Sequence, residues 1–290
     1  MLEKILRTIE YLIPKSIYRE AQPIYHFLLS LMGAIFYRFP SKHIRVVGIT
    51  GTKGKTTTVE LVNTILEEAG YQTALASTLR IKIGDTSKRN LYKMTMPGRF
   101  FMQKFLRQAV VERCDYVVVE ITSEGVKQFR HKFLNLDALI VTNISPEHIE
   151  SHGSYEKYLE AKLKIAKALE TSSKKEKIII VNEDDREADK FLAVNIPRKI
   201  TYSLDNALPF KLIKSGSNIT FEGESITLNL PGEFNIYNAL AATTFGRSQK
   251  VDTKIIKKAL EKFSGVRGRM EEIKEGQNFT VIIDYAHTKD

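Results

Sequence analysis

The sequence predicts an α/β fold in which a mostly parallel β-sheet is flanked by helices, with a small antiparallel β patch added late in the chain. Three observations lead to this prediction. Short apolar runs rich in β-branched residues alternate with longer amphipathic segments, the pattern of parallel strands joined by crossover helices. A glycine-rich turn joins the first such run to a long amphipathic segment. Between residues 197 and 232, three shorter alternating runs are separated by turn residues, as in antiparallel hairpins.

The predicted elements follow one another in a regular order. Residues 1–43 predict two helices, broken at Pro14 and closed by Pro40, because proline removes a backbone donor. A buried strand is predicted at 44–50, followed by a helix that ends near Gly70. The later strand candidates are QTALAST, DYVVVEIT, DALIVTNI and KIIIVN, and the helix candidates between them include RFFMQKFLRQAVVER and YEKYLEAKLKIAKALE. The antiparallel patch is predicted from KITYSL, NITFEG and SITLNL, before a helix at NIYNALAATTFGRSQ and a last strand at FTVIIDYAH.

Composition and charge narrow the possible functions. The chain has 290 residues, of which 43% are hydrophobic and 27% charged, an ordinary balance for a protein with a buried core. The single cysteine, Cys114, excludes an internal disulfide and suits a reducing cytoplasm, where we expect the protein to work. The net charge of +10 favours anionic ligands. Because the lysines are scattered and no nucleic-acid-binding module is recognisable, we expect no nucleic-acid partner.

The N-terminal region leaves two interpretations open. Charged residues interrupt the apolar residues at the start of the chain, so no signal peptide is recognisable. The apolar stretch Phe27–Tyr37 is shorter than the roughly twenty residues that a membrane-spanning helix needs. This stretch either packs on the core or lies on a membrane surface beside its basic neighbours. Packing is the favoured interpretation, and peripheral membrane contact through the N-terminal helices is the alternative.

The strongest local signal is a glycine loop, GITGTKGKTTT at 48–58, which lies between a predicted strand and a predicted helix. Gly51 and Gly54 allow the backbone to curl so that several N–H groups point inward. Those donors, together with the positive end of the following helix, can hold phosphate oxygens. Lys55 would reach the outer phosphates, and Thr56 would offer its hydroxyl to Mg²⁺. The sequence therefore predicts a P-loop.

The loop is a variant, because the general P-loop motif has a glycine where this chain has Ile49. The variant G-T-x-G-K-[ST]-[ST] resembles the loop of the Mur ligase family. Seven polar positions that recur around the nucleotide in that family find a match in order: Lys55, Glu120, His148, Asn235, Asn238, Arg269 and Asp284. The phrases FNIYNALAA, GRMEE, DYAHT and HGSYEKYLEAK look most like the family members that join lysine or diaminopimelate to UDP-N-acetylmuramoyl-Ala-Glu.

The resemblance implies an ATP-dependent amide ligase of peptidoglycan precursor synthesis. In such an enzyme a carboxylate of the UDP-MurNAc-peptide attacks the γ-phosphate of ATP and becomes an acyl phosphate, from which the amine of an amino acid then displaces phosphate. The implied cofactors are ATP and Mg²⁺. The protein's main task is to neutralise charge on the transferring phosphoryl group.

The resemblance also implies roles for individual residues. The nucleotide would contact Gly51, Thr52, Lys53, Gly54, Lys55, Thr56, Thr57, Asn235, Asn238, Arg269, Asp284 and His287. The metal ligands would be Thr56, Glu120, His148 and Lys162, with Lys55, Lys162 and His148 as the catalytic residues. The acceptor substrate would meet Thr95, Thr122, Ser123 and Arg130. Lys162 matches the lysine that the family carries as a carbamate, an anion that can bridge metal and phosphate.

The expected organisation is a helical segment at 1–43, a Mur ligase central ATP-binding domain at 44–270 and the first strand of a truncated C-terminal domain at 271–290. We expect the uridine-gripping domain of such ligases and most of their C-terminal domain to be missing from this sequence. Two explanations stay open: the sequence is a fragment, or the protein is a minimal relative and a partner supplies the missing C-terminal domain. The chain alone is expected to bind ATP weakly and not to join an amino acid. Two other functions stay open: a folylpolyglutamate-synthase-like ligase and a non-catalytic nucleotide-binding module.

Overall fold

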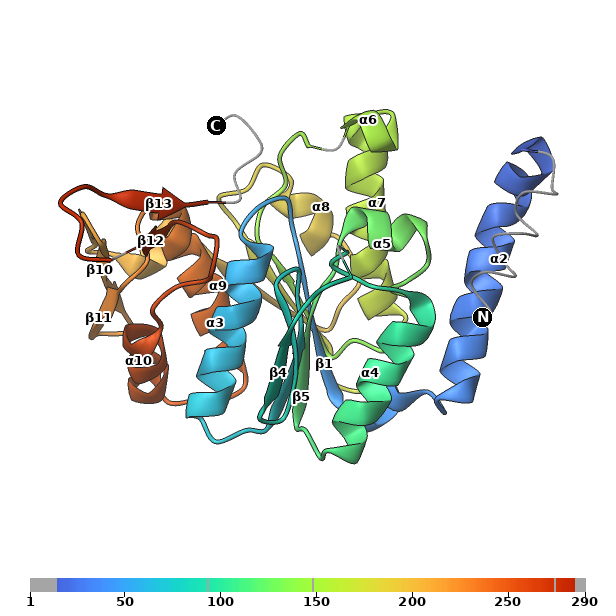
Figure 1. The fold of residues 1–290 in the computed structure, drawn as a ribbon, viewed down its shortest axis with the longest axis horizontal. Helices are drawn as coiled ribbons and strands as arrows, with labels where there is room; N and C mark the ends of the chain where they lie inside the picture. The colour runs from blue at the N-terminus through green and yellow to red at the C-terminus, as the bar shows by residue number, and fades with distance from the viewer. Residues whose placement is uncertain (1–14, 93, 148, 274, 285–290) are drawn as a thin grey trace.

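The computed structural model describes residues 15–92, 94–147, 149–273 and 275–284. Its centre is an eight-stranded sheet (Figure 1). In sheet order the strands are β4 (Thr86–Arg89), β3 (Arg80–Ile83), β2 (Thr73–Ala76), β5 (Tyr116–Glu120), β1 (Arg45–Thr50), β6 (Ala138–Val141), β7 (Ile178–Asn182) and β8 (Arg198–Tyr202). From β2 to β8 all neighbours run parallel, while β3 and β4 extend one edge as antiparallel strands.

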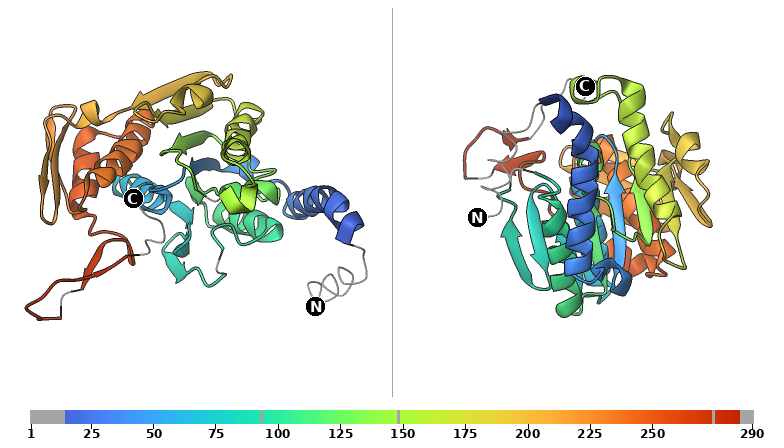
Figure 2. Two further views of the ribbon diagram at one scale, coloured as in Figure 1. Left: turned by 90° about the horizontal axis from the view of Figure 1, so that it is seen from above. Right: turned by 90° about the vertical axis from the view of Figure 1, so that its right-hand side faces the viewer.

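Helices cover both faces of this sheet, so the predicted α/β architecture is confirmed (Figures 1 and 2). One face carries α3 (Lys55–Glu68), α9 (Glu233–Ser248) and α10 (Thr253–Lys262). The other face carries α4 (Arg99–Val111), α7 (Tyr155–Glu170) and α8 (Ala188–Leu192). The shorter elements are η1 (Pro40–His43), α5 (Ser123–Lys127), α6 (Ile149–His152) and η2 (Leu204–Ala207), and α2 (Lys15–Phe36) lies on the flank outside α4.

Alternation of side chains along each strand divides the core between the two faces. In β1, Val47 and Ile49 pack under α3 and α9, whereas Val46 belongs to the core under α4. Because both faces are covered, the central strands are apolar throughout and all five residues of β5 and of β7 are buried.

One predicted strand was assigned to the wrong sheet. The segment KITYSL forms β8, which pairs in parallel with β7 at the edge of the main sheet. Its alternating character reflects that edge position, because the first two residues of β8 are exposed and only Tyr202 is fully buried. The small antiparallel sheet is confirmed, but it consists of β9 (Lys211–Ile213), β10 (Gly216–Phe221) and β11 (Glu224–Leu228). The β3–β4 hairpin was not predicted.

The last described residues form a separate pair of strands. Within the segment FTVIIDYAH, β13 (Val281–Ile283) pairs antiparallel with β12 (Glu271–Ile273). The backbone N–H of Met270 donates to a carboxylate oxygen of Asp284 at 2.7 Å, which ties the end of β13 to the turn before β12. The division of the chain at residue 270 remains a prediction.

Acid should destabilise the fold through His131. This side chain is buried in the turn after α5, and burial, aided by Lys132 and Lys164, lowers its pKa to about 4. In the unfolded chain the imidazole binds a proton near pH 6.5, so stability is lost as pH falls from 6.5 towards 4. We expect His131→Gln to reduce the loss of unfolding free energy between pH 7.5 and pH 5 by about 2 kcal/mol, measured by urea denaturation.

The control for this prediction is His43→Gln, which changes an exposed histidine in η1. The control should keep the wild-type difference between the two pH values. An equal pH dependence in wild type and His131→Gln would show that His131 does not sense acid.

Candidate functional site

The glycine loop lies between β1 and α3, at the carboxyl edge of the sheet. Gly51 follows β1 and has φ +147°, and a Cβ there would lie 1.9 Å from the hydroxyl oxygen of Thr142. Gly54 has φ +79°, and a Cβ there would lie 2.1 Å from the side-chain oxygen of Asn238. Both positions therefore require glycine for close approach as well as for backbone conformation. The loop ends at Lys55, where α3 begins and its first N–H groups are available to an anion.

The residues that follow β6 hold the glycine loop through hydrogen bonds. The backbone N–H of Thr52 donates to the carbonyl of Asn143 at 2.7 Å, and that of Lys53 donates to the Asn143 side chain at 2.9 Å. The hydroxyl of Thr142 donates to the carbonyl of Lys53 at 2.7 Å. The ammonium of Lys55 donates to the carbonyl of Thr52 at 2.7 Å, so the lysine folds over its own loop.

A chain of hydrogen bonds leads from the loop to the next strand end. Glu120, the last residue of β5, accepts from the hydroxyl of Thr56 at 3.1 Å. The same carboxylate oxygen accepts from the backbone N–H and the hydroxyl of Thr78, each at 2.9 Å. The hydroxyls of Thr78 and Thr95 lie 2.9 Å apart. Residues predicted for metal, nucleotide and acceptor therefore share one network.

Lys162 lies beneath the loop and is 2% exposed. Its ammonium donates to the carbonyl of Gly51 at 2.7 Å and lies 3.3 Å from the hydroxyl of Thr50. Burial lowers the pKa of Lys162 well below its usual value, and the nearby charge of Lys55 acts in the same direction. Burial also lowers the pKa of Lys55, against the attraction of Glu120 and Glu147.

The predicted acceptor residues gather around α5. Thr122 caps this helix by accepting from the N–H of Gly125 at 3.1 Å. Ser123 lies 3.1 Å from the ring of His152, which also contacts the carboxylate of Glu124. The Arg130 guanidinium donates to the carbonyl of Met96 and to the side chain of Gln128. Helix α2 supports this turn, since the hydroxyl of Ser30 donates to the carbonyl of Phe129 at 2.8 Å.

These groups open into one cleft of about 970 Å³. Its lining includes fifteen of the predicted site residues: Thr52, Lys53, Gly54, Lys55, Thr56, Thr57, Thr95, Glu120, Thr122, Ser123, Arg130, Asn235, Asn238, Arg269 and Asp284. Gly51 and Lys162 lie behind the loop. His148 and His287 lie outside the described residues. Thr78, Asn143 and Glu147 also line the cleft and were missed, although Thr78 and Asn143 lie at the carboxyl ends of predicted strands, where ligands of parallel sheets bind.

The side chains of the cleft fit a Mg²⁺ ion that is coordinated by both protein and phosphate oxygens. Among the described residues, no three His, Cys, Asp or Glu side chains gather into a metal cluster. Mg²⁺ in phosphate sites takes one or two protein oxygens and completes its shell with phosphate and water. The Glu120 carboxylate and the Thr56 hydroxyl are such oxygens, and they lie beside the loop.

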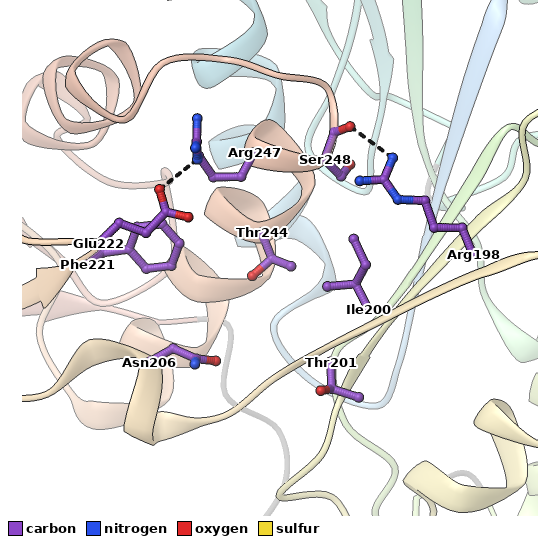
Figure 3. A pocket seen from close by; sticks show the side chains of 9 residues that line it. All are labelled: Arg198, Ile200, Thr201, Asn206, Phe221, Glu222, Thr244, Arg247 and Ser248. Carbon is purple, nitrogen blue, oxygen red and sulfur yellow. Dashed lines mark hydrogen bonds and ion pairs between the residues drawn. The ribbon is translucent and has the colours of Figure 1, made fainter.

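A second cavity of about 410 Å³ lies at the other end of α9 (Figure 3). It contains Arg198 and Arg247, but each is paired inside the protein. The Arg247 guanidinium contacts Glu222 at 2.7 Å, and that of Arg198 donates to the carbonyl of Ser248 at 3.3 Å. No predicted site residue lines this cavity, so the candidate site is the larger cleft.

We expect Gly54→Ala to weaken nucleotide binding about tenfold or more. A methyl group there would meet Asn238 and displace the loop, besides straining a positive φ. Gly70→Ala is a matched control, because Gly70 has φ +87° with open space around it. The control should lose some stability but keep nucleotide affinity, as measured by calorimetry. Equal affinities for both variants would mean that the loop does not hold the nucleotide.

Known proteins resemble this chain over most of its length. The family model described as the Mur ligase middle domain matches residues 49–246. The chain belongs to the Mur ligase family. A UDP-N-acetylmuramoyl-L-alanyl-D-glutamate–2,6-diaminopimelate ligase from Syntrophomonas wolfei is 35% identical over 271 residues, which cover 90% of this chain and 55% of that protein. A UDP-N-acetylmuramyl-tripeptide synthetase from Roseiflexus sp. is 34% identical over 279 residues, with the same coverage.

Solved structures share the fold of this Mur ligase family member. A UDP-N-acetylmuramoyl-L-alanyl-D-glutamate–2,6-diaminopimelate ligase superposes with a TM-score of 0.74 at 24% identity, covering 90% of this chain and 55% of that one. A Mycobacterium tuberculosis folylpolyglutamate synthase, complexed with ADP and AMPPCP, superposes with a TM-score of 0.70 at 16% identity. The superposition covers 90% of this chain and 67% of that one. The chain therefore spans about half the length of the curated Mur ligases that it matches.

Proposed function

We propose that the cleft binds ATP and activates a carboxylate of a UDP-MurNAc-peptide, so that an amino acid can be joined to it through an amide bond. The observation that carries this proposal is the hydrogen-bonded chain Thr56–Glu120–Thr78–Thr95. It links the phosphate side of the cleft to the predicted acceptor side. The identity to diaminopimelate ligases supports the same chemistry.

In the proposed reaction, an acceptor carboxylate oxygen attacks the γ-phosphorus, and the bond from that phosphorus to the bridging oxygen of ADP breaks. The amine nitrogen then attacks the acyl carbon, phosphate leaves, and the nitrogen loses a proton. A bound Mg²⁺ would supply positive charge beside the phosphate oxygens.

The chain's own residues would bind and orient both substrates. The N–H groups of Gly54 and Lys55 would hold phosphate oxygens, and the Lys55 ammonium would turn from the Thr52 carbonyl to the outer phosphates. The amide pair Asn235–Asn238, joined at 3.0 Å, would support the loop from the nucleotide side. Thr95 and Arg130 would orient the acceptor, since a guanidinium pairs well with carboxylate.

The test measures ADP formation from ATP in the presence of Mg²⁺ and either lysine or diaminopimelate. The acceptor substrate is varied between reactions. We expect ADP formation to rise when UDP-N-acetylmuramoyl-Ala-Glu is added. A rise with folyl-glutamate alone would replace the proposal by a folylpolyglutamate-synthase-like function. Nucleotide binding without a rise for either acceptor would indicate a non-catalytic nucleotide-binding module.

A further inference from the structure

Helix α2 packs on the body of the protein with its small and polar side. Within residues 21–36, it buries His26, Ser30, Gly33 and Ala34. A Cβ on Gly33 would lie 3.5 Å from the Cα of Phe100, so the two helices α2 and α4 approach closely at this point. Phe27 also contacts the rings of Phe129 and Phe133, but close packing through glycine and alanine leaves several larger side chains of α2 on the outside.

The outer side of α2 is apolar. It exposes Ile24, Leu28, Met32, Ile35 and Phe36, with exposed fractions between 49% and 72%. Steps of four residues lead from Ile24 through Leu28 to Met32, and Ile35 and Phe36 follow Met32 by three and four residues, which places them on one face of the helix. The usual orientation of an amphipathic helix is thus reversed, since these apolar side chains are exposed. We call these five residues the α2 stripe.

Basic residues flank the α2 stripe. Arg38 and Lys42 follow the helix directly and are exposed, and Lys104 is exposed on the neighbouring α4. From residue 21 to residue 59 the sequence contains no Asp or Glu. A partner for this surface should therefore combine an apolar interior with negative charge at its boundary.

These features favour lipid over a second copy of the chain. In a two-fold pair the same patch meets itself, so both copies would bring basic residues to one interface, to which residues 21–59 contribute no Asp or Glu. An anionic bilayer instead presents acyl chains to the apolar residues and negative headgroups to the basic ones. Among the described residues, no helix is long and apolar enough to cross a membrane, so the contact would be with the bilayer surface.

We propose that the α2 stripe docks on the surface of an anionic lipid bilayer, with Arg38, Lys42 and Lys104 at headgroup level. The contact would hold the enzyme at a membrane while the cleft, on the carboxyl edge of the sheet, stays open. The proposal is independent of the ligase reaction, because neither nucleotide nor acceptor takes part.

The test is co-sedimentation of the full chain with vesicles of phosphatidylcholine alone, or of phosphatidylcholine with one-third phosphatidylglycerol. We expect binding to the anionic vesicles, and a loss of about tenfold or more in the double variant Leu28→Glu/Met32→Glu. The matched control is Leu212→Glu in β9. Leu212 is 48% exposed, against 49% for Leu28, and lies in the small sheet at the opposite end of the molecule. This control should bind like wild type.

The salt dependence of vesicle binding and the oligomeric state of the protein distinguish lipid binding from dimerisation. Raising the salt concentration should weaken binding, because it screens the basic residues from the headgroups. Failure of the wild type to sediment with anionic vesicles would overturn the proposal, as would equal sedimentation of the double variant. A dimer in sedimentation velocity that Leu28→Glu/Met32→Glu dissociates, without vesicle binding by the wild type, would assign the α2 stripe to a second copy instead.

Discussion

Replacing Lys55 with alanine should lower ATP affinity or turnover by about 100-fold or more while leaving the fold intact. The Lys55 ammonium lies over the glycine loop and donates to the carbonyl of Thr52. Burial disfavours the charged form of Lys55, and its pKa is lowered for that reason. A triphosphate would add negative charge beside Lys55 to that of Glu120 and Glu147 and so favour its charged form, which means that the charge of Lys55 serves the ligand more than the fold. Nucleotide affinity by calorimetry and turnover by ADP release would measure the loss.

The matched control for Lys55→Ala is Lys254→Ala. Lys254 is exposed and also lies in the first turn of a helix, α10, but outside the cleft. Both variants should have melting temperatures close to that of the wild type. If Lys55→Ala melts normally and still binds MgATP with wild-type affinity, the loop does not hold the phosphates.

The sequence predicted the centre of the fold better than its edges. The central strands are apolar on both faces, and the glycine loop marks where β1 ends. The sequence therefore predicted the order of the central strands along the chain. The edge strand β8 was assigned to the wrong sheet because a half-exposed strand alternates in the same way in parallel and antiparallel sheets. The four residues of β4 are all exposed and carry no apolar pattern, so nothing in the sequence indicated that hairpin.

The residues of the candidate site also differ in how well the sequence predicts them. A motif can indicate Lys55 or Glu120, because their neighbours along the chain are informative. Thr78 and Asn143 act through contacts with residues far away in the sequence, and only the pairing of β2 with β5 and of β1 with β6 brings them to the loop. For α2 the sequence left both orientations open, because an apolar helical pattern does not reveal which side faces the core.

Lys162 should be carbamylated when CO₂ is available, and Lys162→Ala should lower turnover by about 100-fold or more. Burial lowers the pKa of Lys162, so more of it is neutral amine near neutral pH than for an exposed lysine. The neutral nitrogen attacks the carbon of CO₂, a C–N bond forms, and loss of one proton leaves a carbamate anion. Carbon-13 NMR in labelled bicarbonate should show a protein-bound carbonyl signal that Lys162→Ala lacks.

The control for this prediction is Lys164→Ala on the same helix. Lys164 is exposed and pairs with Glu160 at 3.0 Å, so the control should keep both the carbonyl signal and turnover. Acetate or formate should restore part of the activity of Lys162→Ala, because a free carboxylate can replace the missing anion, but should not restore Lys55→Ala, which lacks a cation. Native turnover in Lys162→Ala would contradict the metal-bridging role. A carbonyl signal that persists in that variant would place the modification on another residue.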